Sequence, residues 1–262
     1  MLLCEGLCYN GPTMQTQQRM NRPGLQQGQI FWIVVGLIFV AYGLWQLGPL
    51  AFVSIVVSLV VGVTVHECAH AWAADRLGDP TARHLGRVSL NPLVHLDPAG
   101  TMMMAVTAVT GTGIGWGKPV PVSTHRLRYG SKRGGALVSL AGPVSNLLLA
   151  GLLGVAFRAA LGGPFWLLQV LLVIIQTNVI LAVFNLLPLP PLDGFAVLIG
   201  LLSLIKTRWA WTVQNTLSGL ARYGGMVLIG ILVVGGLLRI NILGWILLPP
   251  ARWLLGLITG LR

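Results

Sequence analysis

Two histidines and a glutamate lie close together at the end of an apolar stretch of the chain. His66 and His70 are four residues apart, and Glu67 follows His66 directly. In a helix, this spacing places both imidazoles on one face, one turn apart. Two imidazoles placed in this way can bind one zinc ion, and the neighbouring carboxylate can act as general base on a zinc-bound water. The alternative is a helix end with two interfacial histidines and an isolated glutamate.

Asp193 is the candidate for a third metal ligand. The 262-residue chain has only six acidic residues, and two of them, Glu67 and Asp193, stand at the ends of apolar stretches. A carboxylate at membrane depth is costly, so it usually has a partner and a function. One Zn²⁺ ion, two ionised carboxylates and neutral imidazoles sum to zero charge, which suits a medium of low dielectric constant. Alternatively, Asp193 is a turn residue, a role that Asp-Gly pairs commonly take.

The composition indicates that membrane spans position these residues. Hydrophobic residues make up 55% of the chain and charged residues 9%, against roughly a quarter charged in a soluble domain. Long uncharged runs separate the charged clusters, and a spanning helix needs about 20 apolar residues. We expect an all-α polytopic membrane protein with about six transmembrane helices, at 30–47, 50–74, 134–157, 164–187, about 223–238 and about 240–259. They belong to one domain, 29–262, preceded by a flexible polar tail, 1–28.

The net charge of +11 would suggest nucleic acid as a partner of a soluble protein. Here the basic residues form short clusters between apolar runs, at 19–22, 76–87 and 126–133. Cytoplasmic loops of membrane proteins carry such an excess of Lys and Arg. We therefore expect the lipid bilayer as a partner, no nucleic acid, and a cytoplasmic N-terminus.

The connection between the second and third spans is uncharged from Pro98 to Gly117 but is interrupted by glycines and threonines. We expect a short segment that dips into the membrane, followed by a small β-strand or hairpin. Non-helical backbone at membrane depth must be surrounded by protein or line a water-filled cavity.

The strand expected at 116–122 has one edge that keeps its hydrogen-bond donors. Pro119 and Pro121 remove N–H groups from the opposite edge only. On the intact edge, three residues, Lys118, Val120 and Val122, could pair with an extended substrate by strand addition. The alternative is an ordinary strand that closes against its own hairpin.

Four segments together resemble the site-2 protease family of intramembrane zinc metalloproteases. They are HECAH at 66–70, GKPVPV at 117–122, AGPVSN at 141–146 and NLLPLPPLDG at 185–194, and the resemblance covers about 50–200, the expected catalytic core. It implies that Asp193 joins His66 and His70 in binding one Zn²⁺ ion per chain. It also implies that Asn146 lies in the catalytic cleft, in contact with substrate or the developing oxyanion. From its position alone, hydrogen bonding between helices is the favoured role of Asn146. Asn185 is expected to support the turn that presents Asp193.

The function implied by this resemblance is intramembrane proteolysis in the plasma membrane of a prokaryote. The substrates would be transmembrane proteins or peptides, cleaved for regulation or for clearance of membrane stubs. We expect a compact form without the PDZ or CBS domains that some members carry. A di-iron desaturase is excluded because five histidines are too few. The remaining alternative is a non-proteolytic metal-binding protein, a transporter or a scaffold, which would not need Glu67. The oligomeric state is not indicated.

Overall fold

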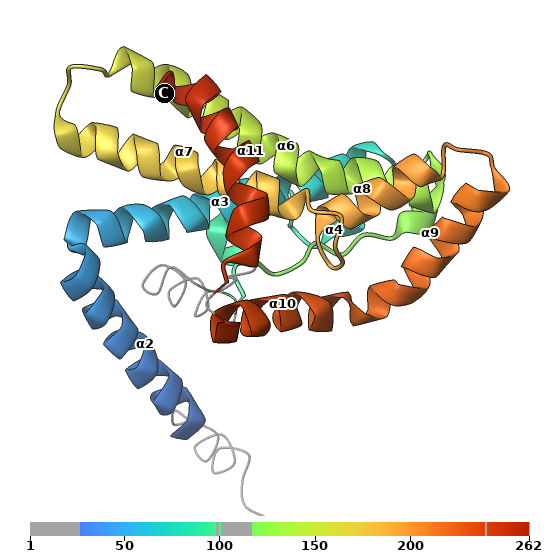
Figure 1. The fold of residues 1–262 in the computed structure, drawn as a ribbon, viewed down its shortest axis with the longest axis horizontal. Coiled ribbons are helices and arrows are strands. Elements are labelled where there is room, and N and C mark those ends of the chain that lie inside the picture. Colours follow the sequence, from blue (N-terminus) through green and yellow to red (C-terminus); the bar gives the residue numbers. More distant parts are fainter. Residues whose placement is uncertain (1–26, 98–99, 101–116, 239, 262) are drawn as a thin grey trace, which may run out of the picture.

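Three long helices form the centre of the molecule in a computed structural model, which describes residues 27–97, 100, 117–238 and 240–261. They are α3 (Pro49–Arg76), α6 (Gly130–Ala159) and α7 (Phe165–Asn185), and each packs against the other two (Figure 1). α3 begins with Pro49, a residue whose fixed φ suits the first position of a helix.

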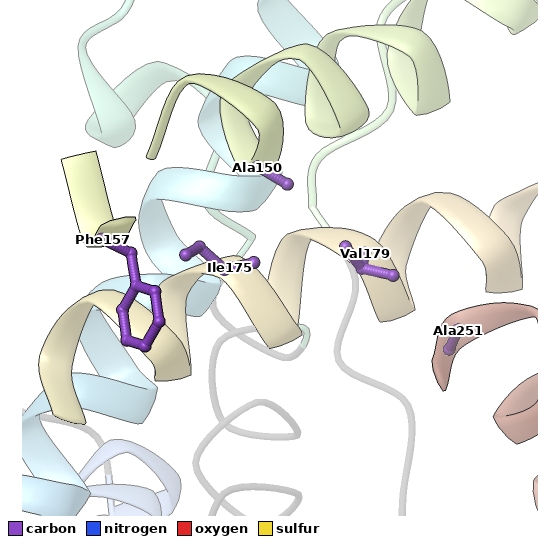
Figure 2. Packing of buried hydrophobic residues seen from close by; sticks show 5 residues of the cluster. All are labelled: Ala150, Phe157, Ile175, Val179 and Ala251. Atoms are coloured by element: carbon purple, nitrogen blue, oxygen red, sulfur yellow. The ribbon is translucent and has the colours of Figure 1, made fainter. Parts of the chain in front are cut away.

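A cluster of buried apolar side chains joins this centre to the last helix, α11 (Ile242–Thr259). Ala150 and Phe157 come from α6, Ile175 and Val179 from α7, and Ala251 from α11 (Figure 2). Small residues in this cluster let the helices approach closely, as membrane helices generally require.

α8 (Asp193–Leu202) follows α7 after a short irregular connection and packs along α6. Gly200 makes this approach possible, because a β-carbon added there would lie 2.2 Å from the β-carbon of Ala136. The C-terminal part of α8 is thereby held against α6.

Three further elements form what we call the arm, residues 208–238. They are α9 (Arg208–Leu220), η3 (Ala221–Tyr223) and α10 (Gly224–Leu238). Figure 1 shows the arm extending around one side of the central helices before α11 returns to them. At the opposite end of the chain, α2 (Gln27–Leu47) runs away from α3.

Five helices in the described part of the chain are long and apolar enough to cross a membrane. They are Pro49–Arg76, Gly130–Ala159, Phe165–Asn185, Arg208–Gly235 and Ile242–Thr259. The expected first span corresponds to α2, which is not among these five helices. The expected span at about 223–238 begins earlier, because the candidate span runs without a break from Arg208 to Gly235. A multi-pass membrane protein is confirmed, but the count of six spans is not.

The connection between α3 and α6 contains only short elements among the described residues: α4 (Thr81–His84), η1 (Pro92–Val94) and η2 (Thr124–Arg126). The expected hairpin is not confirmed, since the pairing described there is a single antiparallel bridge between Leu96 and Gly117. Prolines at 119 and 121 limit any longer ladder because they lack N–H groups. Most of the expected dip, the first strand residue and nearly all of the tail 1–28 lie outside the described residues.

Candidate metal centre

Helix α3 and the start of α8 bring three potential metal ligands together. The Asp193 Oδ2 atom lies 3.1 Å from His66 Nε2 and 3.3 Å from His70 Nε2. Both histidines are buried, with 8% of each residue exposed. A tetrahedral zinc site with bonds of about 2.0–2.1 Å places its ligand atoms about 3.3 Å apart. The three donors therefore have the spacing of one zinc site.

The hydrogen bonds of the two imidazoles identify their tautomers. His66 Nδ1–H donates to Asn146 Oδ1 at 2.7 Å, and His70 Nδ1–H donates to the carbonyl oxygen of Val138 at 2.8 Å. The orientation of the Asn146 amide is set by its nitrogen, which donates to the carbonyl oxygen of Gly62 at 3.0 Å. Since both Nδ1 atoms carry the hydrogen, the lone pairs of both Nε2 atoms face the carboxylate of Asp193.

Three electron-pair donors that face one another require a positive charge between them. A shared proton could satisfy one of the two histidines, whereas one Zn²⁺ ion satisfies all three donors. Metal-binding histidines usually donate their second ring N–H to a carbonyl or carboxylate, as both rings do here. The residues present therefore fit the metal.

Gly142 lets helix α6 lie directly against the two imidazole rings. A β-carbon added at Gly142 would lie 2.5 Å from His70 Nε2 and 2.6 Å from His66 Cε1. No real side chain fits these distances, so this glycine is needed for the close approach. Gly142 was not among the predicted site residues, because a glycine in an apolar helix usually serves helix packing.

The turn before α8 presents Asp193 as the first residue of that helix. Gly194 packs against the end of α7, and a β-carbon added there would lie 2.2 Å from the carbonyl oxygen of Leu186. The chain can therefore fold back sharply enough to bring the Asp193 carboxylate to the histidines of α3.

The three donors open onto a cleft with a volume of about 1200 Å³. Glu67 and Asn185 line it beside the donors, and Pro119, Val120 and Val122 line it from the connection. The arm supplies a further wall through Ser218, Ala221, Gly225, Leu228 and Ile229. The metal site is therefore at the wall of a cleft large enough for an extended polypeptide segment.

The segment 117–123, which we call the cleft segment, lies against α3 beside Glu67. Gly117 allows this, because a β-carbon added there would lie 2.6 Å from Val63 Cγ1 and 3.4 Å from Glu67 Cγ. The N–H of Lys118 donates to the carbonyl oxygen of His95 at 2.7 Å. The backbone N–H of Lys118 is therefore already used within the chain, and the role of Lys118 in substrate binding stays a prediction. Val120 and Val122 have no hydrogen-bond partner within the described residues.

Asp79 holds the other end of the cleft segment. Its Oδ2 accepts a 2.6 Å hydrogen bond from the Ser123 N–H, and its Oδ1 accepts from the hydroxyl and N–H of Thr81. Burial alone would raise the pKa of this carboxyl. The Thr81 hydroxyl, the Ser123 and Thr81 amides and the nearby Arg126 outweigh burial, and the pKa of Asp79 lies below its ordinary value. Asp79 therefore acts as a charged acceptor that joins the ends of α3 and the cleft segment.

The structure separates the two asparagines that the sequence motifs contain. Asn146 is fully buried behind the His66 ring, and its amide also donates to Asn178 Oδ1 at 2.8 Å. It is therefore turned away from the cleft that substrate would occupy. Asn185 lines the cleft, and its amide nitrogen donates to the carbonyl oxygen of Leu181 at 2.9 Å. Asn178 was not among the predicted site residues, although a polar amide in an apolar span is itself a signal of function.

Comparison with known proteins finds relatives that are assigned by name as zinc metalloproteases. YwhC of Bacillus subtilis is 43% identical over 152 residues, which are 55% of this chain and 67% of that protein. Rip2 of Mycolicibacterium smegmatis is 30% identical over 234 residues, 84% of this chain and 86% of that protein. Rip2 of Mycobacterium tuberculosis is 33% identical over 191 residues, 68% of this chain and 72% of that protein. No protein-family model and no solved structure matches the chain.

These relatives, the apolar helices and the buried group of two histidines and one aspartate agree with one another. They do not favour the alternative of a transporter or scaffold, because the relatives are named as metalloproteases. The chain belongs to the site-2 protease family, and it is an intramembrane zinc metalloprotease.

Proposed function

We propose that His66, His70 and Asp193 hold the zinc ion and that Glu67 is the general base of peptide hydrolysis. The observation that carries this assignment is the meeting of three lone-pair donors within 4.8 Å of one another, beside a glutamate that lines the same cleft. When bound, zinc supplies a Lewis acid that polarises the peptide carbonyl and acidifies water. The Glu67 carboxylate accepts the proton of the attacking water and passes it to the leaving amine.

We propose that substrate enters the cleft as an extended strand beside the cleft segment. A transmembrane helix satisfies its own backbone hydrogen bonds, so its peptide bonds become accessible only after local unwinding. The unpartnered N–H groups of Val120 and Val122 could donate hydrogen bonds to the freed carbonyl groups of the substrate. The anchoring of this segment at Lys118 and Ser123 supports the proposal, because it holds both groups in a fixed position beside Glu67.

The two asparagines have different roles in this proposal. Asn146 is a positioning residue, since its carbonyl oxygen orients the His66 ring and its nitrogen is held by Gly62 and Asn178. Asn185 has its side-chain oxygen free of partners among the described residues and lines the cleft, so it could contact substrate.

We further propose that the N-terminus is cytoplasmic and that the protein resides in the plasma membrane of a prokaryote. The basic clusters at 76–87 and 126–133 flank the connection between α3 and α6, which agrees with a cytoplasmic position of that connection. The curated relatives are bacterial. The membrane domain would be 29–262, and its partners would be transmembrane proteins or peptides.

Replacement of Glu67 by glutamine tests the assignment of the base. The Glu67→Gln protein should retain one zinc ion per chain by metal analysis, while cleavage of a transmembrane peptide falls by about 10²–10⁴-fold. Asp75→Asn is a matched control, because Asp75 is a carboxylate near the end of the same helix and pairs with Arg83 at 3.6 Å. The control should cleave like the wild type. Persistent cleavage by Glu67→Gln would exclude Glu67 as the base, and loss of zinc would indicate a ligand role instead.

A further inference from the structure

A second hollow lies at the turn between α8 and α9, outside the metal centre. It has a volume of about 440 Å³, and three cationic side chains, Lys132, Lys206 and Arg208, line it. No ion pair joins any of these side chains to a carboxylate within the described residues. Residues 194–262 contain no Asp or Glu at all. Three positive charges around one hollow repel one another unless an anion is present.

The wall of this hollow holds one cation in place. Lys132 Nζ donates to Gln214 Oε1 at 2.6 Å, and the Gln214 amide nitrogen donates to the carbonyl oxygen of Ile199 at 2.8 Å. Gln214 is 3% exposed. The ammonium group is therefore fixed by a buried side chain that connects α6, α8 and α9, instead of extending freely into solvent.

The N-terminal end of α9 adds hydrogen-bond donors to the same hollow. Thr207 precedes the helix, but its side chain does not cap the first turn. The first N–H groups of a helix are unsatisfied and carry a partial positive charge, so they favour anions. With Lys206 and Arg208 on either side of Thr207, the start of α9 presents both charge and oriented donors.

The position of the hollow indicates where the anion comes from. Two of the candidate spans, Gly130–Ala159 and Arg208–Gly235, begin beside it, and Figure 1 shows the start of α6 and the α8–α9 turn at the same end of the molecule. Trp209 and Trp211 are 58% and 63% exposed next to it. Exposed tryptophans at the ends of spans are typical of the lipid headgroup level.

We propose that this hollow binds the phosphate group of an anionic phospholipid. The cations and the α9 N–H groups would bind the phosphate, while the apolar faces of α6 and α9 lie beside the acyl chains. A zwitterionic lipid carries an additional cation that the three basic side chains repel, so we expect selectivity for net negative lipids. Lys132 also lines the cleft beside the three metal-ligand candidates. A lipid bound between Lys132 and Arg208 would therefore connect the start of the arm to this cleft.

Native mass spectrometry of the purified full-length chain tests this proposal. The protein is titrated with phosphatidylglycerol or with phosphatidylcholine of the same acyl chains. The wild type should retain phosphatidylglycerol in preference, and the Lys206→Gln/Arg208→Gln double variant should bind it about tenfold more weakly or worse. The matched control, Arg222→Gln/Arg252→Gln, removes the same charge from exposed positions outside the hollow and should bind like the wild type.

Three results would overturn the proposal. They are equal retention of the two lipids by the wild type, equal losses in the two double variants, and full displacement of phosphatidylglycerol by millimolar inorganic phosphate, which would identify a free-phosphate site. Zinc content and thermal unfolding of each variant show whether it is folded. A single Arg208→Lys variant, which keeps the charge, should retain lipid if the double variant fails to fold.

Discussion

The central helices and the arm use polar side chains differently. In the centre, polar groups are buried between helices: Asn146 contacts Asn178, and Ser58 of α3 contacts Thr177 of α7 at 2.8 Å. The arm has one such group, Gln214, among its described residues. Lipid is as apolar as leucine, so membrane helices are held together by polar contacts and by close packing of small residues.

This difference separates a site held by many contacts from a cleft wall held by few. The proposed metal ligands come from α3 and α8, which are fixed by glycine contacts and hydrogen bonds with α6. The arm is fastened near the cleft by Gln214 and by Gly224, where an added β-carbon would lie 2.4 Å from Pro190. A metal site tolerates misplacement of only about 0.5 Å, whereas one wall of a substrate cleft need not be held so closely.

Replacing one glycine by alanine in the central helices and one in the arm should give the largest difference in zinc affinity. Gly142→Ala places a carbon within 2.6 Å of both imidazole rings. Zinc affinity should fall by more than about a hundredfold, beyond the usual effect of a lost orienting partner. Gly151→Ala on the same helix and Gly230→Ala in the arm have no atom within 4 Å of the added carbon and should bind zinc normally. Competition with a chelator measures the affinity, and tight zinc binding by Gly142→Ala would contradict the described packing.

Truncation of the two asparagines separates ligand orientation from substrate contact. Asn146→Ala removes the acceptor of the His66 N–H, and zinc affinity should fall about 10–100-fold. Asn185→Ala should leave zinc affinity unchanged and reduce cleavage, because this side chain lines the cleft without contacting the ligands. Zinc titration and a cleavage assay on the same preparations give both values. A loss of zinc in Asn185→Ala alone would reverse the two roles.

Loosening the arm should leave the central helices intact. Gln214→Leu removes the hydrogen bond to Ile199 and leaves Lys132 without its acceptor. Loss of a hydrogen bond destabilises the folded state by about 1 kcal/mol. The rate of amide hydrogen exchange in α9 should therefore rise about fivefold. Protection of α3 and zinc content should not change in hydrogen-exchange and metal measurements. An equal loss of protection in α3 would show that the two regions unfold together.

The smallest effect is expected from protonation or removal of the Asp79 carboxylate, because this group only positions the backbone at Ser123. Its pKa is lowered in the folded protein, so its contribution is present above the ordinary Asp value of about 3.9 and is lost as the pH falls through the lowered pKa. The protection factor of the Ser123 amide should therefore decrease in that acidic range. In Asp79→Ala, protection should be low at every pH. A wild-type protection factor that does not change with pH would contradict the assigned hydrogen bond.

Much of the site could be predicted from local spacing. His66 and His70 are one helical turn apart, so their shared face follows from helix geometry alone, and Glu67 lies beside them. The roles of Asn146 and Asn185 could not be assigned in this way, because each lies on a helix whose rotation is set by neighbours. Likewise, alternation along a strand predicts that the N–H groups of Lys118, Val120 and Val122 point to the same edge. The hydrogen bond from the Lys118 N–H to the carbonyl oxygen of His95 depends on a loop that folds back, so the sequence did not predict it.

The sequence by itself determined that the chain lies in a membrane and that one helix carries two imidazoles on one face beside a carboxylate. Apolar length and helical periodicity are local properties, so both features follow from them. The tertiary structure alone decided that Asp193, 123 residues beyond His70, meets both rings, and that Gly142 leaves room for them. These contacts join segments far apart in the chain, and their formation depends on how α3, α6 and α8 pack, which no local pattern records.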